Sequence, residues 1–259
     1  MTFFVRYLML ITATLLLTAC RLPITPMVPE QINLKPTRTP TLPPTQTPTP
    51  QPTFTPIPPT ADPIFFRDKF DGKLETGWIW MREVPDQWNL AAVPGSLQID
   101  TGRGFINSQN MSNVLLRPVP EGDFQIETKL SFLPDDNFQF AGLIIYEDEY
   151  NFLQAGRAYC HSGVCVRNGL YMNHYQNGLI VPPNFGQPYQ QSNVVILRLI
   201  RKGAAYIFEM SADGRMFFIV GEHVSDINPI QIGLATGQNI EGAIIPALFD
   251  YFEITSPQQ

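Results

Sequence analysis

A tract rich in threonine and proline divides this chain and rules out regular structure over about forty residues. The tract runs from Pro23 to Thr60 and holds 13 of the 25 prolines, many in Thr-Pro repeats. Proline fixes φ and has no backbone N–H, so the tract cannot form a helix interior or a central strand. We expect an extended, polyproline-like stalk that reaches roughly 100 Å at about 3.1 Å per residue. A passive disordered tether is compatible with the same composition.

The segment before this tract has the composition of an export signal. An apolar run over Tyr7–Leu17 follows one cation, Arg6, and closes with Thr18, Ala19 and Cys20. The run is shorter than the roughly 20 residues of a membrane span but has the length of a signal-peptide core. Its ending resembles the lipobox of bacterial lipoproteins, in which the signal is cut before the cysteine. The resemblance implies a signal peptide over 1–19 and lipidation of Cys20, against the alternative of an ordinary secretory signal.

The remainder divides into a linker over 20–61 and one folded domain over 62–259. Residues 1–61 carry four cations and one anion, a net charge of +3, and the whole chain carries −6. The folded domain therefore has a net charge near −9, because −6 minus +3 is −9. An acidic domain without a Lys/Arg stripe repels a phosphate backbone, so we expect no nucleic-acid partner.

Two cysteines remain once Cys20 is assigned to lipid. Four residues separate Cys160 from Cys165, and an even number in an oxidising compartment predicts a disulfide. A metal site or a pair of free thiols is the alternative: His161 next to Cys160 would suit zinc, although no set of four ligands is visible in the sequence.

Alternating apolar and polar residues predict strands throughout the folded domain. In Asp123–Phe132 every second residue is apolar for most of its length, which is typical of a strand with one buried face. Phe140–Tyr146 is apolar on both faces, as in a central strand. Further strands are expected over 193–200, 205–210, 216–220, 231–235 and 247–254, with Asp213-Gly214 in a hairpin turn. Many short strands separated by turns indicate an all-β sandwich of two antiparallel sheets.

Several short motifs then resemble one family. They are Asp68-Lys69-Phe70-Asp71, Trp78-Ile79-Trp80 with Pro85 and Trp88, Pro94-Gly95-Ser96-Leu97, Gln139-Phe140-Ala141-Gly142-Leu143, Ser211-Ala212-Asp213-Gly214 and Phe249-Asp250-Tyr251-Phe252. From Phe65 to Ile254 the chain is similar to concanavalin A-like lectin/glucanase domains. The resemblance is greatest to the non-catalytic C-terminal domain of bacterial β-xylosidases and to DUF1349-type relatives. It implies a jelly-roll sandwich and supports fold more directly than function.

Polar aromatic residues with amides and arginine suggest a carbohydrate-binding rim. The segment from Gln154 to Tyr189 is rich in them and contains the turn signals Asn168-Gly169, Asn177-Gly178 and Pro182-Pro183. Such side chains can stack on sugar rings and bond hydroxyls, although a single tyrosine can equally pack the core. The predicted binding residues are Tyr146, Arg157, Tyr159, Tyr171, His174 and Tyr175.

The acidic residues raise two further kinds of site, a catalytic carboxylate pair and a calcium site. The cluster Glu147-Asp148-Glu149 departs from the Glu-x-Asp-x-x-Glu pattern of sugar-cleaving relatives and falls where a hairpin should turn, so no catalytic residue is assigned. Asp68 or Asp71 with Asp250 matches the position of a structural Ca²⁺ in several domains of this fold. Structural ion pairs or turn caps are the alternative use of these aspartates, and no other cofactor is expected.

Together these features predict a lipid-anchored, extracytoplasmic module at the cell membrane or cell surface that binds an extracellular polysaccharide or other glycan without cleaving it. We expect it to be a monomer. The alternatives are a glycoside hydrolase-like enzyme acting on extracellular glycans and an envelope scaffold that binds proteins.

Overall fold

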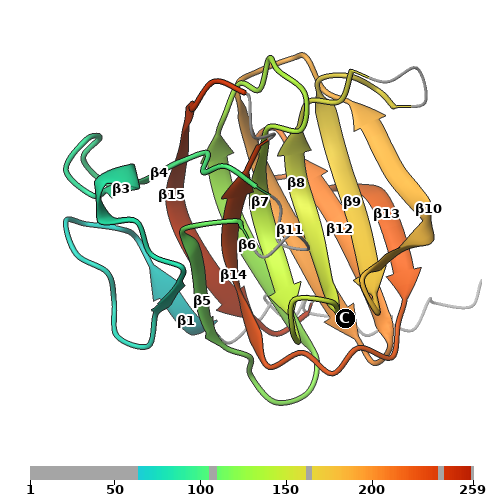
Figure 1. The fold of residues 1–259 in the computed structure, drawn as a ribbon. Coiled ribbons are helices and arrows are strands. Elements are labelled where there is room, and N and C mark those ends of the chain that lie inside the picture. Colours follow the sequence, from blue (N-terminus) through green and yellow to red (C-terminus); the bar gives the residue numbers. More distant parts are fainter. Residues whose placement is uncertain (1–63, 105–109, 162–164, 239–241, 258–259) are drawn as a thin grey trace, which may run out of the picture. The chain divides into compact units, whose positions relative to one another are not determined.

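The computed structural model describes residues 64–104, 110–161, 165–238 and 242–257. These residues form strands in two antiparallel sheets and one short 3-10 helix, η1 (Pro85–Gln87), which confirms the predicted all-β sandwich. Figure 1 shows the two sheets stacked face to face. Within this described part, no helix has the length and apolar character needed to span a bilayer.

One sheet contains eight of the described strands, in the order β13-β12-β11-β6-β15-β4-β3, with β1 also paired to β15. Long-range pairing builds it, since the last strand, β15, lies between β6 and β4 and also holds the first strand. Its strands are β1 (Ile64–Asp68), β3 (Trp88–Asn89), β4 (Leu97–Asp100), β6 (Phe124–Ser131), β11 (Val194–Lys202), β12 (Ala205–Ser211), β13 (Phe218–Val224) and β15 (Pro246–Thr255).

The other sheet contains seven of the described strands, in the order β10-β9-β8-β7-β14-β5-β2. Four consecutive strands, β7 to β10, form an antiparallel meander at one side of it. Its strands are β2 (Ile79–Met81), β5 (Val114–Pro118), β7 (Phe140–Tyr146), β8 (Phe152–Ala158), β9 (Gly169–Gln176), β10 (Leu179–Pro188) and β14 (Gln231–Gly237).

The main core lies between the sheets and follows the alternation seen in the sequence. In β6, Phe124, Ile126 and Leu130 are fully buried, while Glu127 and Lys129 face outward. Each such side chain contributes about 1.5–3 kcal/mol when it leaves water, so the period-two pattern orients the strand.

A second apolar cluster covers the outer face of the seven-stranded sheet, which explains why β7 is apolar on both faces. Leu143 and Ile145 belong to the main core, whereas Phe140 and Ile144 belong to the second cluster. Neighbouring residues of a strand point to opposite faces, so this cluster lies on the side of the sheet away from the sandwich core. Its other buried members are Met111, Val114, Leu116, Phe152 and Ala235.

The structure corrects three expectations about local elements. The stretch Gln154–Tyr189, expected to supply loops, forms most of β8, β9 and β10, and only Asn177-Gly178 makes the tight β9–β10 turn, with φ of +53° and +74°. Pro182-Pro183 lies inside β10 and not in a loop, at a bulge in an edge strand, where a missing N–H is tolerated. Strand β13 begins at Phe218, two residues later than expected, because Asp213 accepts bonds from Arg215 and Met216 in the turn.

Candidate functional site

A cavity of about 370 Å³ opens on the outer face of the seven-stranded sheet, over strands β7 to β10. Its volume falls within the range of small-ligand sites. The described residues that line it include no Asp, Glu, Lys, Arg or His. They are Met111, Phe138, Phe140, Gln154, Ala158, Tyr159, Cys160, Cys165, Val166, Tyr171, Asn173, Tyr175, Ile180, Asn184, Phe185 and Gly186.

Glycines create the hollow in the sheet surface. Gly142 of β7 pairs with Gly156 of β8, and this pair lies between the pairs Phe140–Ala158 and Ile144–Gln154. A Cβ on Gly156 would lie 2.3 Å from the carbonyl oxygen of Ala141, so no side chain fits at this position. Because the Gly142–Gly156 pair has no side chains, the sheet surface is lower there than at the two pairs on either side of it.

Tyrosines stand along one wall of the cavity. Tyr171 and Tyr175 lie four residues apart on the same face of β9. The ring of Tyr175 stacks on that of Phe152, with ring centroids 4.5 Å apart. Tyr171 donates its hydroxyl hydrogen bond to the carbonyl oxygen of Arg167 (2.6 Å), which holds the ring upright. Burial raises the pKa of both tyrosines, so they remain neutral phenols that offer ring faces.

Three amides supply the polar groups of the cavity. Gln154 of β8 lies directly opposite Asn173 of β9, and Asn184 comes from β10. Within the described part of the chain, no hydrogen bond engages these three side chains. Gln154 is 8% exposed, and its amide atoms are not among the fully enclosed unpartnered atoms, so they remain accessible from the cavity. The arrangement therefore presents uncharged donors and acceptors that a ligand could satisfy.

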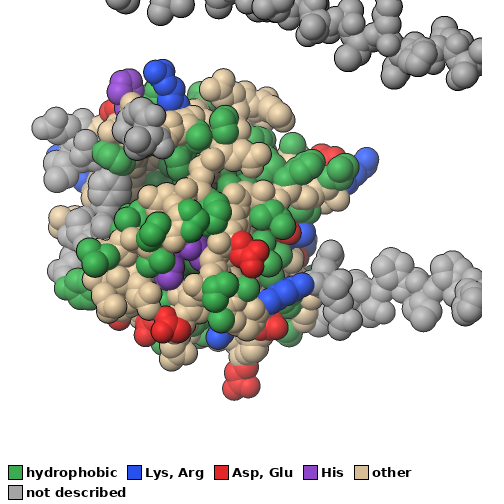
Figure 2. Space-filling view, turned by 90° about the vertical axis from the view of Figure 1, so that its right-hand side faces the viewer, with side chains coloured by type: hydrophobic (Ala, Val, Ile, Leu, Met, Phe, Trp, Pro, Cys, Tyr) green, Lys and Arg blue, Asp and Glu red, His purple; other side chains and the backbone are tan. Residues whose placement is uncertain are grey.

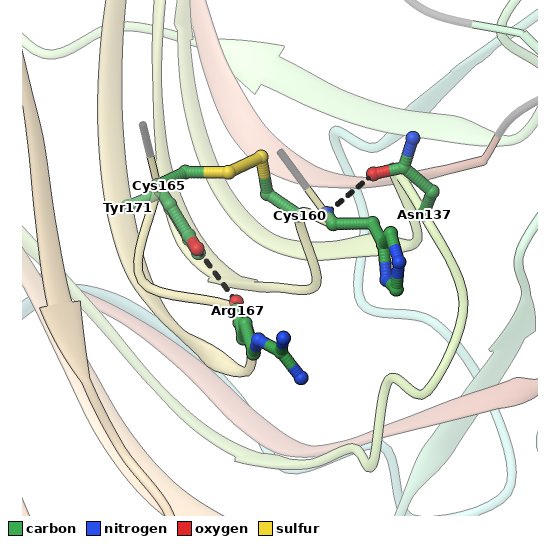
Figure 3. Close-up of a disulfide and its surroundings, with 6 residues drawn as sticks. Asn137, Cys160, Cys165, Arg167 and Tyr171 are labelled. Atoms are coloured by element: carbon green, nitrogen blue, oxygen red, sulfur yellow. Dashed lines mark hydrogen bonds between the residues drawn. A yellow bond between two sulfur atoms is a disulfide. The ribbon is translucent and has the colours of Figure 1, made fainter. Parts of the chain in front are cut away.

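The predicted disulfide is present and forms part of the cavity wall. Cys160 and Cys165 are bonded, with Cα atoms 6.0 Å apart, a usual separation for a disulfide. Figure 3 shows the bond beside Tyr171 and Arg167, while Asn137 accepts a hydrogen bond from the backbone N–H of His161 (2.8 Å). These contacts anchor the loop that carries Tyr159, whose ring stacks on His161 with centroids 6.3 Å apart.

Four of the six predicted binding residues lie on the cavity face. Tyr159, Tyr171 and Tyr175 line the cavity, and Tyr146 packs against the apolar cluster on the same face. Burial raises the pKa of Tyr146, and nearby Arg82 opposes the shift, so this hydroxyl also stays protonated.

Arg157 and His174 do not reach the cavity, because both point between the two sheets and are 1% exposed. Arg157 donates to the Oδ1 of Asn168 (3.2 Å) and to the carbonyl oxygen of Ser192 (2.7 Å), which is a structural role. Their inclusion in the binding set is therefore corrected. Each is adjacent in sequence to a residue that does line the cavity, and neighbours in a strand face opposite sides. The same alternation, applied to the sequence, would have selected Gln154 and Asn173, which the prediction omitted.

The aspartates considered for calcium have other partners. Asp68 accepts three hydrogen bonds of 2.8 Å, from the backbone N–H groups of Phe70 and Glu75 and from Trp78 Nε1. Asp250 pairs with the ammonium of Lys129 at 2.6 Å. Within the ranges that the structure describes, no three potential metal ligands from His, Cys, Asp and Glu are gathered.

We therefore expect calcium removal to leave the stability of the domain unchanged. The positive charge of Lys129 and the three N–H donors already satisfy the carboxylates that a Ca²⁺ ion would need. Thermal melting with EDTA, and again after excess Ca²⁺ is added, measures this. A melting midpoint that falls with EDTA and recovers with calcium would show that the domain does bind a structural calcium ion.

The paired antiparallel sheets and the hollow on the outer face of one of them define a concanavalin A-like sandwich. The family profile of the β-xylosidase C-terminal concanavalin A-like domain matches residues 67–255. The chain therefore belongs to this family. A search among curated proteins finds no match.

Several solved structures share this fold. The GH43 protein BlXynB from Bacillus licheniformis superposes with a TM-score of 0.65 and 18% identity, over 74% of this chain and 39% of that one. A xylan β-1,4-xylosidase from Bacillus halodurans gives 0.63 and 22%, over 73% and 39%. The β-glucanase of Bacillus licheniformis gives 0.51 and 11%, over 74% and 98%. The chain thus spans about two fifths of the length of the first two of these proteins, and identities this low establish the fold alone.

Proposed function

We propose that this protein is a lipid-anchored surface module that binds an uncharged glycan in the cavity over β7 to β10, without cleaving it. The observation that carries the proposal is the set of three unengaged amides, Gln154, Asn173 and Asn184, between tyrosine rings. An amide offers a donor and an acceptor together, which matches a sugar hydroxyl that both donates and accepts. The absence of charged side chains among the described lining residues disfavours phosphate, carboxylate or ammonium ligands.

The proposal of a non-catalytic role is supported by the position of the acidic residues. A glycosidase needs two carboxyl groups beside the scissile bond, one of them with a raised pKa. The acidic cluster lies in the β7–β8 turn, where Glu147 accepts a bond from the backbone N–H of Asn228 (2.9 Å). Burial alone would raise the pKa of Asp148, but hydrogen bonds from Asn151 and from the backbone of Tyr150 lower it. That shift has the wrong direction for a general acid.

The location of the module is proposed from the sequence alone, because the predicted signal peptide, Cys20 and the Thr/Pro tract lie outside the residues that the structure describes. Cys20 supplies the lipid anchor, and the Thr/Pro tract gives the reach that carries the domain to extracellular polysaccharide. The relatives named as xylosidase and glucanase act on polysaccharides, which makes a glycan the most natural ligand class.

Titration of the full chain with soluble glycans tests this function. We expect neutral oligosaccharides, such as xylo-, arabino- or gluco-oligosaccharides, to bind and to shift the amide resonances of the Asn173 side chain. Acidic glycans, such as polygalacturonate, should not bind, because no cation lines the described part of the cavity. Absence of binding by every neutral glycan, or release of reducing sugar during the titration, would contradict the proposal.

A second candidate function is protein binding along the edge strand β13. Phe218, Ile219 and Val224 of this strand are 53%, 62% and 74% exposed, and the outer side of the strand has no partner in the described sheet. An exposed apolar edge can add a strand from another chain. A negative result with all glycans would make this edge the leading candidate.

A further inference from the structure

A pair of histidines joins the two sheets behind the cavity. His174 belongs to β9 of the seven-stranded sheet and His223 to β13 of the eight-stranded sheet, and their ring centroids are 5.2 Å apart. The two side chains are 1% and 4% exposed. Figure 2 views the side of the domain where β10 and β13 lie, and histidine side chains show between hydrophobic ones there. The pair therefore lies at an edge of the sandwich, where β13 of one sheet contacts β9 and β10 of the other.

The pair is poorly prepared to carry charge. Ser225 Oγ lies 2.9 Å from His174 Nε2, but His174 Nδ1 and His223 Nε2 are buried without a hydrogen-bond partner. Burial lowers the pKa of both rings, and for His174 the neighbouring His223 lowers it further, while Asp226 opposes the shift. A proton on either ring would place a charge between the sheets with little to compensate it.

Among the described residues, Asp226 is the one charged group outside the pair that acts on either ring. Arg201 and Glu147 act on the neighbouring Tyr206. Asp226 follows β13 and also accepts a bond from Gln176 Nε2 (2.6 Å). Tyr206 of β12 lies opposite His223, and burial raises the pKa of its hydroxyl, so it stays neutral. Strand β10 contributes Phe185, and β13 contributes Gly221, neither of which titrates.

The same residues connect the pair to the cavity. Asn173 and Tyr175, the neighbours of His174 on β9, both line the cavity. Phe185 of β10 lines it too and packs edge-on against His223, with centroids 5.1 Å apart and an interplanar angle of 79°. Phe185 also lies over Gly221, where a Cβ would be 2.3 Å from its ring. A shift of β9 or β10 away from β13 would therefore displace one wall of the cavity.

We infer that the contact between His174 and His223, here called the histidine clasp, is sensitive to acid. Protonation of either ring loosens the contact of β9 and β10 with β13 and lowers the affinity of the cavity for its glycan. Only the last step rests on the proposed function. The clasp would let a surface module release its ligand when the medium turns acidic.

The direction of the pH effect follows from proton counting. In the unfolded chain these histidines titrate near 6.5, and in the folded protein they titrate lower. Below pH 6.5 the unfolded state therefore binds more protons than the folded state, and stability falls as the pH decreases. The loss begins near pH 6.5 and is complete once the folded-state pKa values have been passed. Above this window the clasp contributes its full stability.

The test uses the full chain and compares it with the double variant His174→Gln/His223→Phe, which cannot titrate at these positions. The single variant His223→Phe guards against misfolding of the double variant, since it keeps the His174–Ser225 contact. His161→Gln serves as the control for acid dependence, because His161 is the third histidine of the chain and is exposed. Since His161 stacks on Tyr159 of the cavity, the affinity of this variant at each pH is compared with its own value at about pH 8. Melting temperature, amide exchange in β9 and β10, and affinity for a neutral oligosaccharide are measured from about pH 8 to about pH 5.

In the unmodified chain and in His161→Gln, we expect faster exchange in β9 and β10 and about tenfold weaker glycan binding at the acidic end. The double variant should lose much less, and His223→Phe, which keeps the titratable His174, should fall between the two. Equal acid sensitivity in all proteins, or constant exchange in β9 and β10, would overturn the clasp. Exchange that rises while affinity stays constant would overturn its coupling to the cavity. If no glycan binds at neutral pH, the proposed function fails, and melting and exchange still decide the clasp.

Discussion

Replacement of Gln154 by Met and Asn173 by Leu should weaken glycan binding roughly 30- to 150-fold while the domain stays folded. Both substitutions keep side-chain volume and remove the hydrogen-bonding groups that lie opposite each other on β8 and β9. Two lost hydrogen bonds correspond to about 2–3 kcal/mol, which gives this range. Neither amide has a partner among the described residues, so their removal costs the folded protein no bond. Calorimetric titration with the best neutral oligosaccharide measures the loss.

The matched control for this variant is Gln187→Met. Gln187 lies on the same strand as Asn184, is exposed and does not line the cavity. We expect its affinity to equal that of the unmodified chain. Unchanged binding by the Gln154/Asn173 double variant would show that the glycan binds elsewhere. A lowered melting temperature would assign the two amides a structural role.

The second large effect is on stability: Gly156→Ala should destabilise the domain by about 3 kcal/mol or more, at the upper end of overpacking effects. The added Cβ would lie 2.3 Å from the Ala141 carbonyl oxygen and 2.7 Å from Gly142 Cα. These are backbone atoms of β7, a central strand paired on both sides, so they cannot yield as a flexible side chain would. For a domain of this size the melting temperature should fall by roughly 6–12 °C.

Gly122→Ala separates this clash from the general cost of replacing glycine. Gly122 has a φ of +77°, but no atom lies within 4 Å of the position of its Cβ. Only backbone strain of about 1–2 kcal/mol is expected there. Melting curves of the two variants should therefore differ clearly. If Gly156→Ala melts at or above the temperature of Gly122→Ala, β7 and β8 are less closely paired than the structure indicates.

Local patterns in the sequence predicted much of the fold. The alternation over Asp123–Phe132 located β6 to within one residue at each end, and the apolar run Phe140–Tyr146 coincides with β7. These predictions succeeded because each strand buries one or both faces over its whole length, which leaves a clear period in the residues. The prediction for Pro182-Pro183 was wrong because proline can occupy an edge strand, and the edge position of β10 depends on distant pairing.

The site was harder to predict than the fold, for a related reason. Tyr171, His174 and Tyr175 share one strand and similar chemistry, yet only the tyrosines line the cavity, while His174 faces the core. Residue composition alone cannot tell which of these three side chains faces the cavity and which faces the core. The glycine row at Gly142 and Gly156 gave no recognisable signal either, because its effect depends on the pairing of β7 with β8.

The sequence by itself determined the all-β class, the family, the strand periods and the cysteines that pair, since these follow from local composition and spacing. Only the tertiary structure decided which face of β8 and β9 is covered by the second sheet and which is left open. Period two assigns side chains to two faces but does not say which face is inside. That choice is made by contacts between strands far apart in the chain. It places two amides, Gln154 and Asn173, and two tyrosines, Tyr171 and Tyr175, on the open face, with Arg157 and His174 inside.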